Sequence, residues 1–290
     1  MTAPAQATPL SSRVSASVAA PDTESCLAAL RALPTGVGSA EVRLDLMTSF
    51  SVPRVVEGSP VPLVITYRPV WEGGRFDGPE AERLGVLREA YEAGVAFVDV
   101  EATCVGEVAA WGESPTRVIA SKHSYDSMPA DLWQQYERLR DSADVVKLVG
   151  LAGTAADCVP VLELLRDATT PVIALAMGEA GGITRLIGPC FDSCLLTYGV
   201  ADATKATAGG QFTLDEMIGG YHLDVVSPDT AVTMHVCTTD EHVSAVAERQ
   251  AAATPGAELH LAVRVGPAER DTTVDRLGSV LPNVRVSAAG

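Results

Sequence analysis

A lysine inside an apolar run is the residue of this sequence with the clearest capacity for chemistry. Lys147 stands among valines and a leucine, and the other two lysines of the chain are Lys122 and Lys205. Burial lowers the pKa of an amine and frees it to attack a carbonyl as a Schiff-base nucleophile. The alternative is a lysine at the rim of the fold that pairs with Asp144 or Glu101.

His123 is the second candidate, because it follows another apolar run and is the only histidine before residue 222. An imidazole titrates near neutrality, so it can accept a proton and return it. Glu72 could orient the ring and support its charged form. The alternatives are a structural histidine and an exposed loop carboxylate.

Three arginines near the ends of apolar runs are the third element. Arg43, Arg68 and Arg185 could bind a carboxylate through bidentate contacts. Alternatively, each arginine pairs with a nearby glutamate, and these are Glu41, Glu72 and Glu179.

The sequence predicts no metal site and no phosphate loop. The six cysteines include no CxxC pair, so we expect them to be reduced and mostly buried, with a zinc site as a weak alternative. The glycines between residues 178 and 188 lack the GK[ST] of a P-loop. The small residues from Thr207 to Gln211 form either a lid or an ordinary connection.

Composition narrows the partners and the location. A formal net charge of −16 argues against nucleic acid and anionic membranes. No stretch approaches the roughly 20 apolar residues that span a bilayer, and the first residues lack the apolar core of a signal peptide. We therefore expect a cytoplasmic protein with a flexible leader over residues 1–12, and a homodimer as the commonest oligomer.

The elements that must position these residues are short apolar runs separated by helical patterns. Several runs are almost continuous Val, Ile, Leu and Ala, which is typical of parallel strands buried on both faces. Eight runs qualify, and they are Arg13–Ala19, Ala40–Leu46, Leu63–Arg68, Ala96–Glu101, Arg117–Lys122, Asp144–Val149, Val172–Met177 and Cys194–Tyr198.

Helix signals separate the runs. Pro79 opens a helix that Asp77 or Gly78 could cap, Pro129 opens another, and Thr154 can cap a third. This repetition predicts parallel strands with right-handed crossovers. We therefore predict a (β/α)8 TIM barrel over residues 13–226, with the candidate side chains at the strand ends, where barrel active sites lie.

The pattern changes after about Val226. Residues 227–290 predict a small C-terminal α/β extension with strands near 232–237, 258–265 and 284–287 and helices near 240–253 and 274–280. The sequence indicates no role for this extension beyond packing or oligomerisation.

From about Arg13 to Gln211 the chain resembles the type I 3-dehydroquinate dehydratase family. Seven segments in order carry the resemblance: Glu41-Val-Arg43-Leu-Asp45, Thr66-Tyr-Arg68 with Glu72-Gly-Gly, Asp99-Val-Glu101, Ser121-Lys-His123, Asp144-Val-Val-Lys147, Met177-Gly-Glu-Ala-Gly-Gly-Ile-Thr-Arg185 and Lys205-Ala-Thr-Ala-Gly-Gly-Gln211.

The resemblance implies a lyase of the shikimate pathway of aromatic amino acid biosynthesis, which dehydrates 3-dehydroquinate without a cofactor. Lys147 would form a Schiff base with this anionic cyclic keto acid, and His123 would carry the proton while Glu72 holds it. Arg185 would bind the carboxylate. The remaining substrate-binding residues would be Glu41, Arg43, Arg68, Thr207 and Gln211.

Three positions depart from the family pattern, because Ser124, Thr207 and Gly209 stand where it has other residues. A glycine in place of the lid proline should loosen the closed lid. Three alternatives therefore stay open. They are a Schiff-base aldolase, a dehydratase for a related cyclic keto acid in a secondary pathway, and a non-catalytic barrel module.

Overall fold

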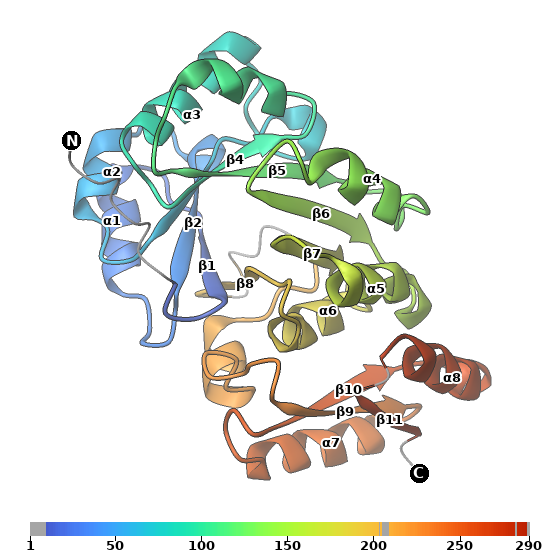
Figure 1. Cartoon of the computed structure of the whole chain (residues 1–290). Coiled ribbons are helices and arrows are strands. Elements are labelled where there is room, and N and C mark those ends of the chain that lie inside the picture. Colours follow the sequence, from blue (N-terminus) through green and yellow to red (C-terminus); the bar gives the residue numbers. More distant parts are fainter. Residues whose placement is uncertain (1–9, 203, 205–208, 282, 289–290) are drawn as a thin grey trace.

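Eight parallel strands form the larger of two sheets. The computed structural model describes residues 10–202, 204, 209–281 and 283–288. The strand order is β7-β6-β5-β4-β3-β2-β1-β8, and a bridge between Val172 and Cys194 brings β7 and β8 together into a nearly closed ring. The predicted (β/α)8 barrel is confirmed (Figure 1). Its strands are β1 (Val14–Val18), β2 (Ser39–Arg43), β3 (Leu63–Thr66), β4 (Phe97–Glu101), β5 (Arg117–His123), β6 (Val145–Leu151), β7 (Val172–Met177) and β8 (Thr197–Val200).

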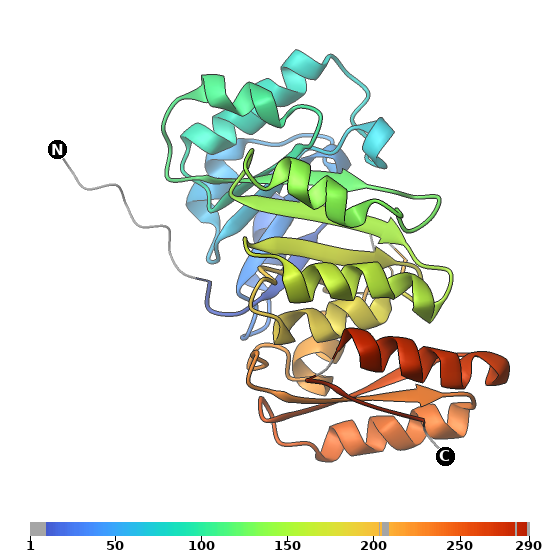
Figure 2. The same ribbon diagram turned by 45° about the vertical axis from the view of Figure 1, so that its right-hand side comes forward.

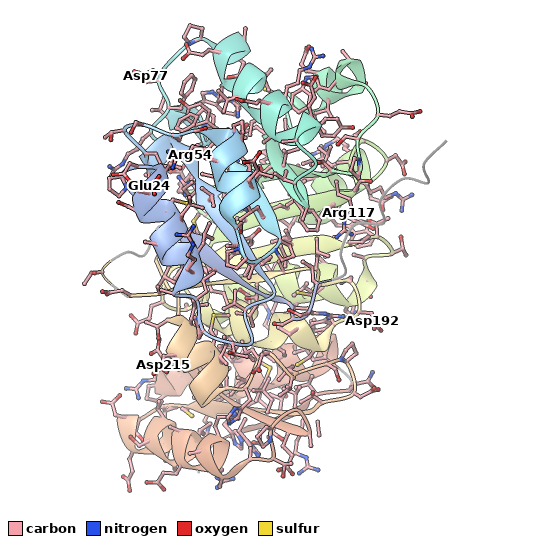
Figure 3. The ribbon with its side chains drawn as sticks, turned by 90° about the vertical axis from the view of Figure 1, so that its left-hand side faces the viewer. Glu24, Arg54, Asp77, Arg117, Asp192 and Asp215 are labelled. Atoms are coloured by element: carbon pink, nitrogen blue, oxygen red, sulfur yellow. The ribbon has the colours of Figure 1, made fainter. Side chains whose placement is uncertain are left out.

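Helices cover the outside of the barrel. They are α1 (Thr23–Arg31), α2 (Val52–Gly58), α3 (Glu80–Glu92), α4 (Leu132–Leu139), α5 (Val159–Asp167) and α6 (Gly182–Ile187), with a 3-10 helix at Val105–Trp111 between β4 and β5. Figure 3 shows α1 and α2 side by side, where Glu24 and Arg54 form a surface ion pair.

One predicted helix start and one predicted helix cap are wrong, although α3 does begin at Pro79-Glu80 as predicted. Pro79 is extended and is itself the N-cap of α3, without a side-chain cap, so neither Asp77 nor Gly78 caps it. Helix α4 begins at Leu132, behind Asp131, rather than at Pro129. The Thr154 prediction is confirmed, because Thr154 and Asp157 form a capping box on the 3-10 turn that leads into α5.

Side chains along each strand point alternately into and out of the barrel, so the inward-pointing residues form layers in its interior. Phe97, Ile119 and Val145 belong to a buried apolar cluster. Two residues further along the same strands, and therefore on the same face, stand Asp99, Ser121 and Lys147. Figure 3 labels Arg117, which begins β5, and Asp77, which lies in the segment after β3. The Arg117 guanidinium is 4.2 Å from the Phe97 ring centroid, so the apolar cluster lies toward the amino ends of the strands. The polar layer thus faces the carboxyl ends of the strands.

The C-terminal extension is a three-stranded parallel sheet between two helices. Strands β9 (Ala231–Cys237), β10 (Glu258–Arg264) and β11 (Arg285–Ala288) lie in the order β10-β9-β11. Helix α7 (Asp240–Ala252) covers the outer face, and α8 (Arg270–Val280) lies on the side of the barrel (Figure 2). Arg166 of α5 donates a 2.8 Å hydrogen bond to the Val280 carbonyl, which ties α8 to the barrel. Within the described segments, no helix is long and apolar enough to cross a membrane.

Candidate active site

The residues expected to do chemistry meet at the carboxyl ends of the barrel strands. Glu72 lies directly behind His123, and Thr207 falls outside the described residues. The other predicted residues line one cavity, together with side chains that the prediction missed. The lining residues are Glu41, Arg43, Arg68, Gly73, His123, Tyr125, Lys147, Val149, Leu175, Met177, Arg185, Tyr198 and Gln211.

Lys147 points into this cavity from β6 and is only 4% exposed. Its Nζ lies 2.9 Å from Glu41 Oε1 and 2.9 Å from Asp99 Oδ2. The alternative partners are wrong. Asp144 instead accepts the backbone N–H of Val118 at 2.8 Å, and Glu101 accepts from Arg68 at 2.7 Å. The alternative position at the rim does not apply to a buried amine.

The charge state of Lys147 also differs from the expectation. Burial by itself lowers the pKa of Lys147, but the carboxylates of Asp99 and Glu41 outweigh burial and hold that pKa above its ordinary value. Lys147 is therefore an ammonium ion among these partners. The predicted lowering of its pKa is wrong, because two carboxylates replace the water that the amine loses.

Arg68 holds the carboxylates beneath Lys147 in place. Its guanidinium donates to Asp99 at 2.8 Å, to Glu101 at 2.7 Å and to Ser121 Oγ at 2.7 Å. Burial alone would raise the pKa of Asp99, but Arg68 and Lys147 keep it well below its usual range. Arg68 thus pairs across neighbouring strands rather than with Glu72, the partner suggested by its place in the sequence.

His123 and Glu72 form a hydrogen-bonded pair at the rim of the cavity. Glu72 Oε2 accepts the backbone N–H of His123 at 2.8 Å and lies 2.9 Å from its Nδ1. Burial, together with the cations of Arg68 and Lys147, keeps the pKa of His123 well below its ordinary value, so the ring is neutral. Burial raises the pKa of Glu72 to about 7. With Nδ1 turned to Glu72, the free Nε2 is the atom that can accept a proton.

The other two predicted arginines, Arg43 and Arg185, differ in their ion pairing. Arg43 donates two hydrogen bonds to Asp45, at 2.9 and 2.8 Å, and does not pair with Glu41 as the alternative proposed. Arg185 is 2% exposed, its Nε has no hydrogen-bond partner, and no ion pair of its guanidinium is found among the described residues. Burial lowers the pKa of Arg185 to about 10. A buried cation that faces a cavity and has no ion-pair partner in the described part of the chain is suited to an anionic ligand.

The described end of the predicted lid packs against β7. The Gly178 N–H donates to the Gly209 carbonyl at 3.2 Å. Gly210 has φ +73°, and a Cβ there would lie 2.1 Å from the Gly178 carbonyl oxygen. Only glycine fits this contact, and the contact brings Gln211 to the cavity.

Three residues of the site were missed as site residues at the sequence level. Asp99 was noted as part of a motif but not as a partner of Lys147, which lies 48 positions away. Tyr125 lines the cavity and donates to the Glu72 carbonyl at 2.8 Å. Tyr198 lies on β8, two residues after buried Leu196. Side chains two positions apart on a strand share a face, so the apolar Leu196 was the sequence signal that Tyr198 points into the barrel.

Comparisons with known proteins agree with this arrangement. The family model described as "Type I 3-dehydroquinase" matches residues 14–228. A 3-dehydroquinate dehydratase of Desulfotalea psychrophila is 37% identical over 63% of this chain and 86% of its own length. The bifunctional 3-dehydroquinate dehydratase/shikimate dehydrogenase of Arabidopsis thaliana is 35% identical over 68% of this chain. The chain spans only 34% of that plant protein.

A solved structure supports the fold independently. The 3-dehydroquinate dehydratase from Geobacillus kaustophilus HTA426 superposes with a TM-score of 0.61 over 72% of this chain and 89% of that one, at 24% identity. At this identity the likeness concerns the barrel itself.

Proposed function

Because the chain belongs to the type I 3-dehydroquinase family, we propose that it dehydrates 3-dehydroquinate to 3-dehydroshikimate through a Schiff base on Lys147. One observation carries the proposal: a buried amine faces a cavity that also holds a neutral histidine and an arginine without a described ion-pair partner. An anionic cyclic ketone is complementary to these three groups.

Binding begins with the substrate carboxylate at Arg185. A carboxylate would supply the counter-ion that no described residue gives this buried guanidinium, and it can form two hydrogen bonds with it. The ring ketone then lies toward Lys147. Gln211 and Glu41 line the same cavity and are available for the ring hydroxyls.

Imine formation requires Lys147 to lose a proton. We assign Glu41 as the acceptor, since its Oε1 is 2.9 Å from Nζ, while Arg68 and Lys147 keep the pKa of Asp99 too low for that task. The neutral amine attacks the carbonyl carbon, a C–N bond forms, and the carbonyl oxygen leaves as water.

Elimination follows on the imine. The protonated imine withdraws electrons from the adjacent carbon, and His123 Nε2 removes a proton from it. The enamine then expels the hydroxyl group, which leaves as water with the proton that His123 returns. Glu72 supports the transient imidazolium through Nδ1. Water hydrolyses the product imine and restores Lys147.

A turnover assay tests the proposal. Purified protein and 3-dehydroquinate should give a rise in ultraviolet absorbance from the conjugated enone, and the rise should survive a chelator. Lys147→Met should abolish it, while Lys122→Met, a matched change at a lysine of β5 next to His123, should not. An absent rise with folded wild-type protein would contradict the proposed substrate and favour a related cyclic keto acid.

A further inference from the structure

Tyr198 carries a buried hydroxyl to which no described residue forms a hydrogen bond. The residue lies on β8, is 3% exposed and lines the cavity. Its ring centroid is 4.7 Å from Lys147 Nζ. Among the described residues, its hydroxyl has no hydrogen-bond partner.

Such a group is unusual enough to require an explanation. Buried polar atoms are nearly always hydrogen-bonded, and leaving one unpaired destabilises the folded state. Arg185 Nε is likewise buried and has no hydrogen-bond partner among the described residues. The two residues lie within electrostatic range of each other, and Thr197, next to Tyr198, donates a 2.8 Å hydrogen bond to the Arg185 carbonyl. Two groups without a hydrogen-bond partner in the described segments thus belong to residues that line the same cavity.

We propose that the Tyr198 hydroxyl donates a hydrogen bond to the same carboxylate that Arg185 binds, which makes Tyr198 a specificity-determining residue for anionic substrates. The inference rests on the proposed function, since it concerns the orientation of that substrate. A carboxylate offers lone pairs on both oxygens, so it can accept from the phenol and the guanidinium at once.

The surroundings keep the phenol in its donor form. Burial raises the pKa of Tyr198, and the carboxylates of Glu41 and Asp99 act in the same direction. Glu41 Oε1 accepts from Lys147 at 2.9 Å and from Thr66 at 3.1 Å, and no hydrogen bond from the Tyr198 hydroxyl to Glu41 is found among the described residues. The donor is therefore available to a ligand.

Tyr198→Phe isolates the hydroxyl, and Tyr136→Phe is the matched control. Tyr136 is equally buried, but its hydroxyl accepts the backbone N–H groups of Thr169 and Thr170 at 3.0 and 3.2 Å, away from the cavity. We would measure Tm, kcat/KM for 3-dehydroquinate, and the affinity for two probes by calorimetry. The probes are quinate, the alcohol related to the ketone, and the same ring with a hydroxymethyl group in place of the carboxylate.

The expected pattern separates binding from packing. Tyr198→Phe should leave Tm unchanged or raise it, while kcat/KM and quinate affinity fall roughly 10- to 100-fold, as for a hydrogen bond to a charged group. Affinity for the neutral probe should not change. Tyr136→Phe should lower Tm and leave kcat/KM and both affinities as in the wild type.

Other results would overturn the inference. Unchanged quinate affinity in Tyr198→Phe would mean that water or another group satisfies the hydroxyl. Equal losses for both probes would mean a general packing role. If the wild type binds quinate without turning over 3-dehydroquinate, the proposed function fails, and a selective loss in Tyr198→Phe still supports the carboxylate contact. Wild-type protein that binds neither compound would contradict both proposals.

Discussion

Glu72→Gln should make the protein both more stable and less active at alkaline pH. Burial raises the pKa of Glu72 from 4.5 to about 7, so the folded state holds a proton that the unfolded chain releases. Stability from this group is fully present below pH 4.5 and is lost as pH rises to about 7. At about 1.4 kcal/mol per pH unit, the ionised carboxylate lowers the free energy of unfolding by up to roughly 3 kcal/mol. A glutamine avoids this loss.

Urea unfolding of wild type and Glu72→Gln at pH 5 and pH 8 measures the effect. Part of the loss has already occurred at pH 5, so the stability of the variant relative to the wild type should rise by roughly 2 to 3 kcal/mol between the two pH values. Glu89→Gln, at an exposed position of α3, is the control and should show no such change.

Activity should move in the opposite direction. Ionised Glu72 accepts from Nδ1 of His123 and supports the imidazolium, so wild-type kcat/KM should increase with pH through about 7. In Glu72→Gln this increase of kcat/KM with pH should disappear, and kcat/KM above about pH 7 should be lower than in the wild type. A relative stability that does not change with pH, or that changes with the opposite sign, would refute the reasoning, because Glu72 would then ionise as readily as in water.

Three further perturbations follow from the site. His123→Ala should still form the imine, with turnover reduced roughly 10²- to 10⁴-fold; a single-turnover assay showing less than a tenfold loss would rule out proton transfer by this ring. Arg68→Met should lower the free energy of unfolding by about 3 to 5 kcal/mol, because it leaves buried carboxylates unpaired. Arg54→Met, at the exposed ion pair with Glu24, should change the free energy of unfolding by less than about 1 kcal/mol. Gly210→Ala should lower kcat/KM through the clash with a carbonyl oxygen, while Gly85→Ala in α3, with open space around it, should raise Tm slightly.

Strand alternation explains why much of the site could be predicted. Lys147 and His123 interrupt apolar runs, and a parallel barrel brings the ends of such runs together. Their partners could not be read in the same way, because the contacts cross strands. Arg68 reaches Asp99 and Glu101 over 31 and 33 positions, while the sequence suggested its nearer neighbour Glu72.

Tyr198 shows more clearly what cannot be predicted from the sequence. The sequence places it at the end of a predicted strand, but only three-dimensional packing reveals that no other described residue satisfies its hydroxyl. The same holds for charge states, since the ammonium of Lys147 depends on Asp99 and Glu41, which lie 48 and 106 positions away. The homodimer and the cytoplasmic location stay predictions, and sedimentation or light scattering of the purified protein measures the first.

Borohydride trapping tests the central claim most directly. Wild-type protein incubated with 3-dehydroquinate and borohydride should gain the mass of one reduced adduct, and peptide mapping should place it on Lys147. Lys147→Met should gain none, and Lys122→Met should be labelled like the wild type. An adduct on another lysine, or turnover of 3-dehydroquinate by Lys147→Met, would contradict the account.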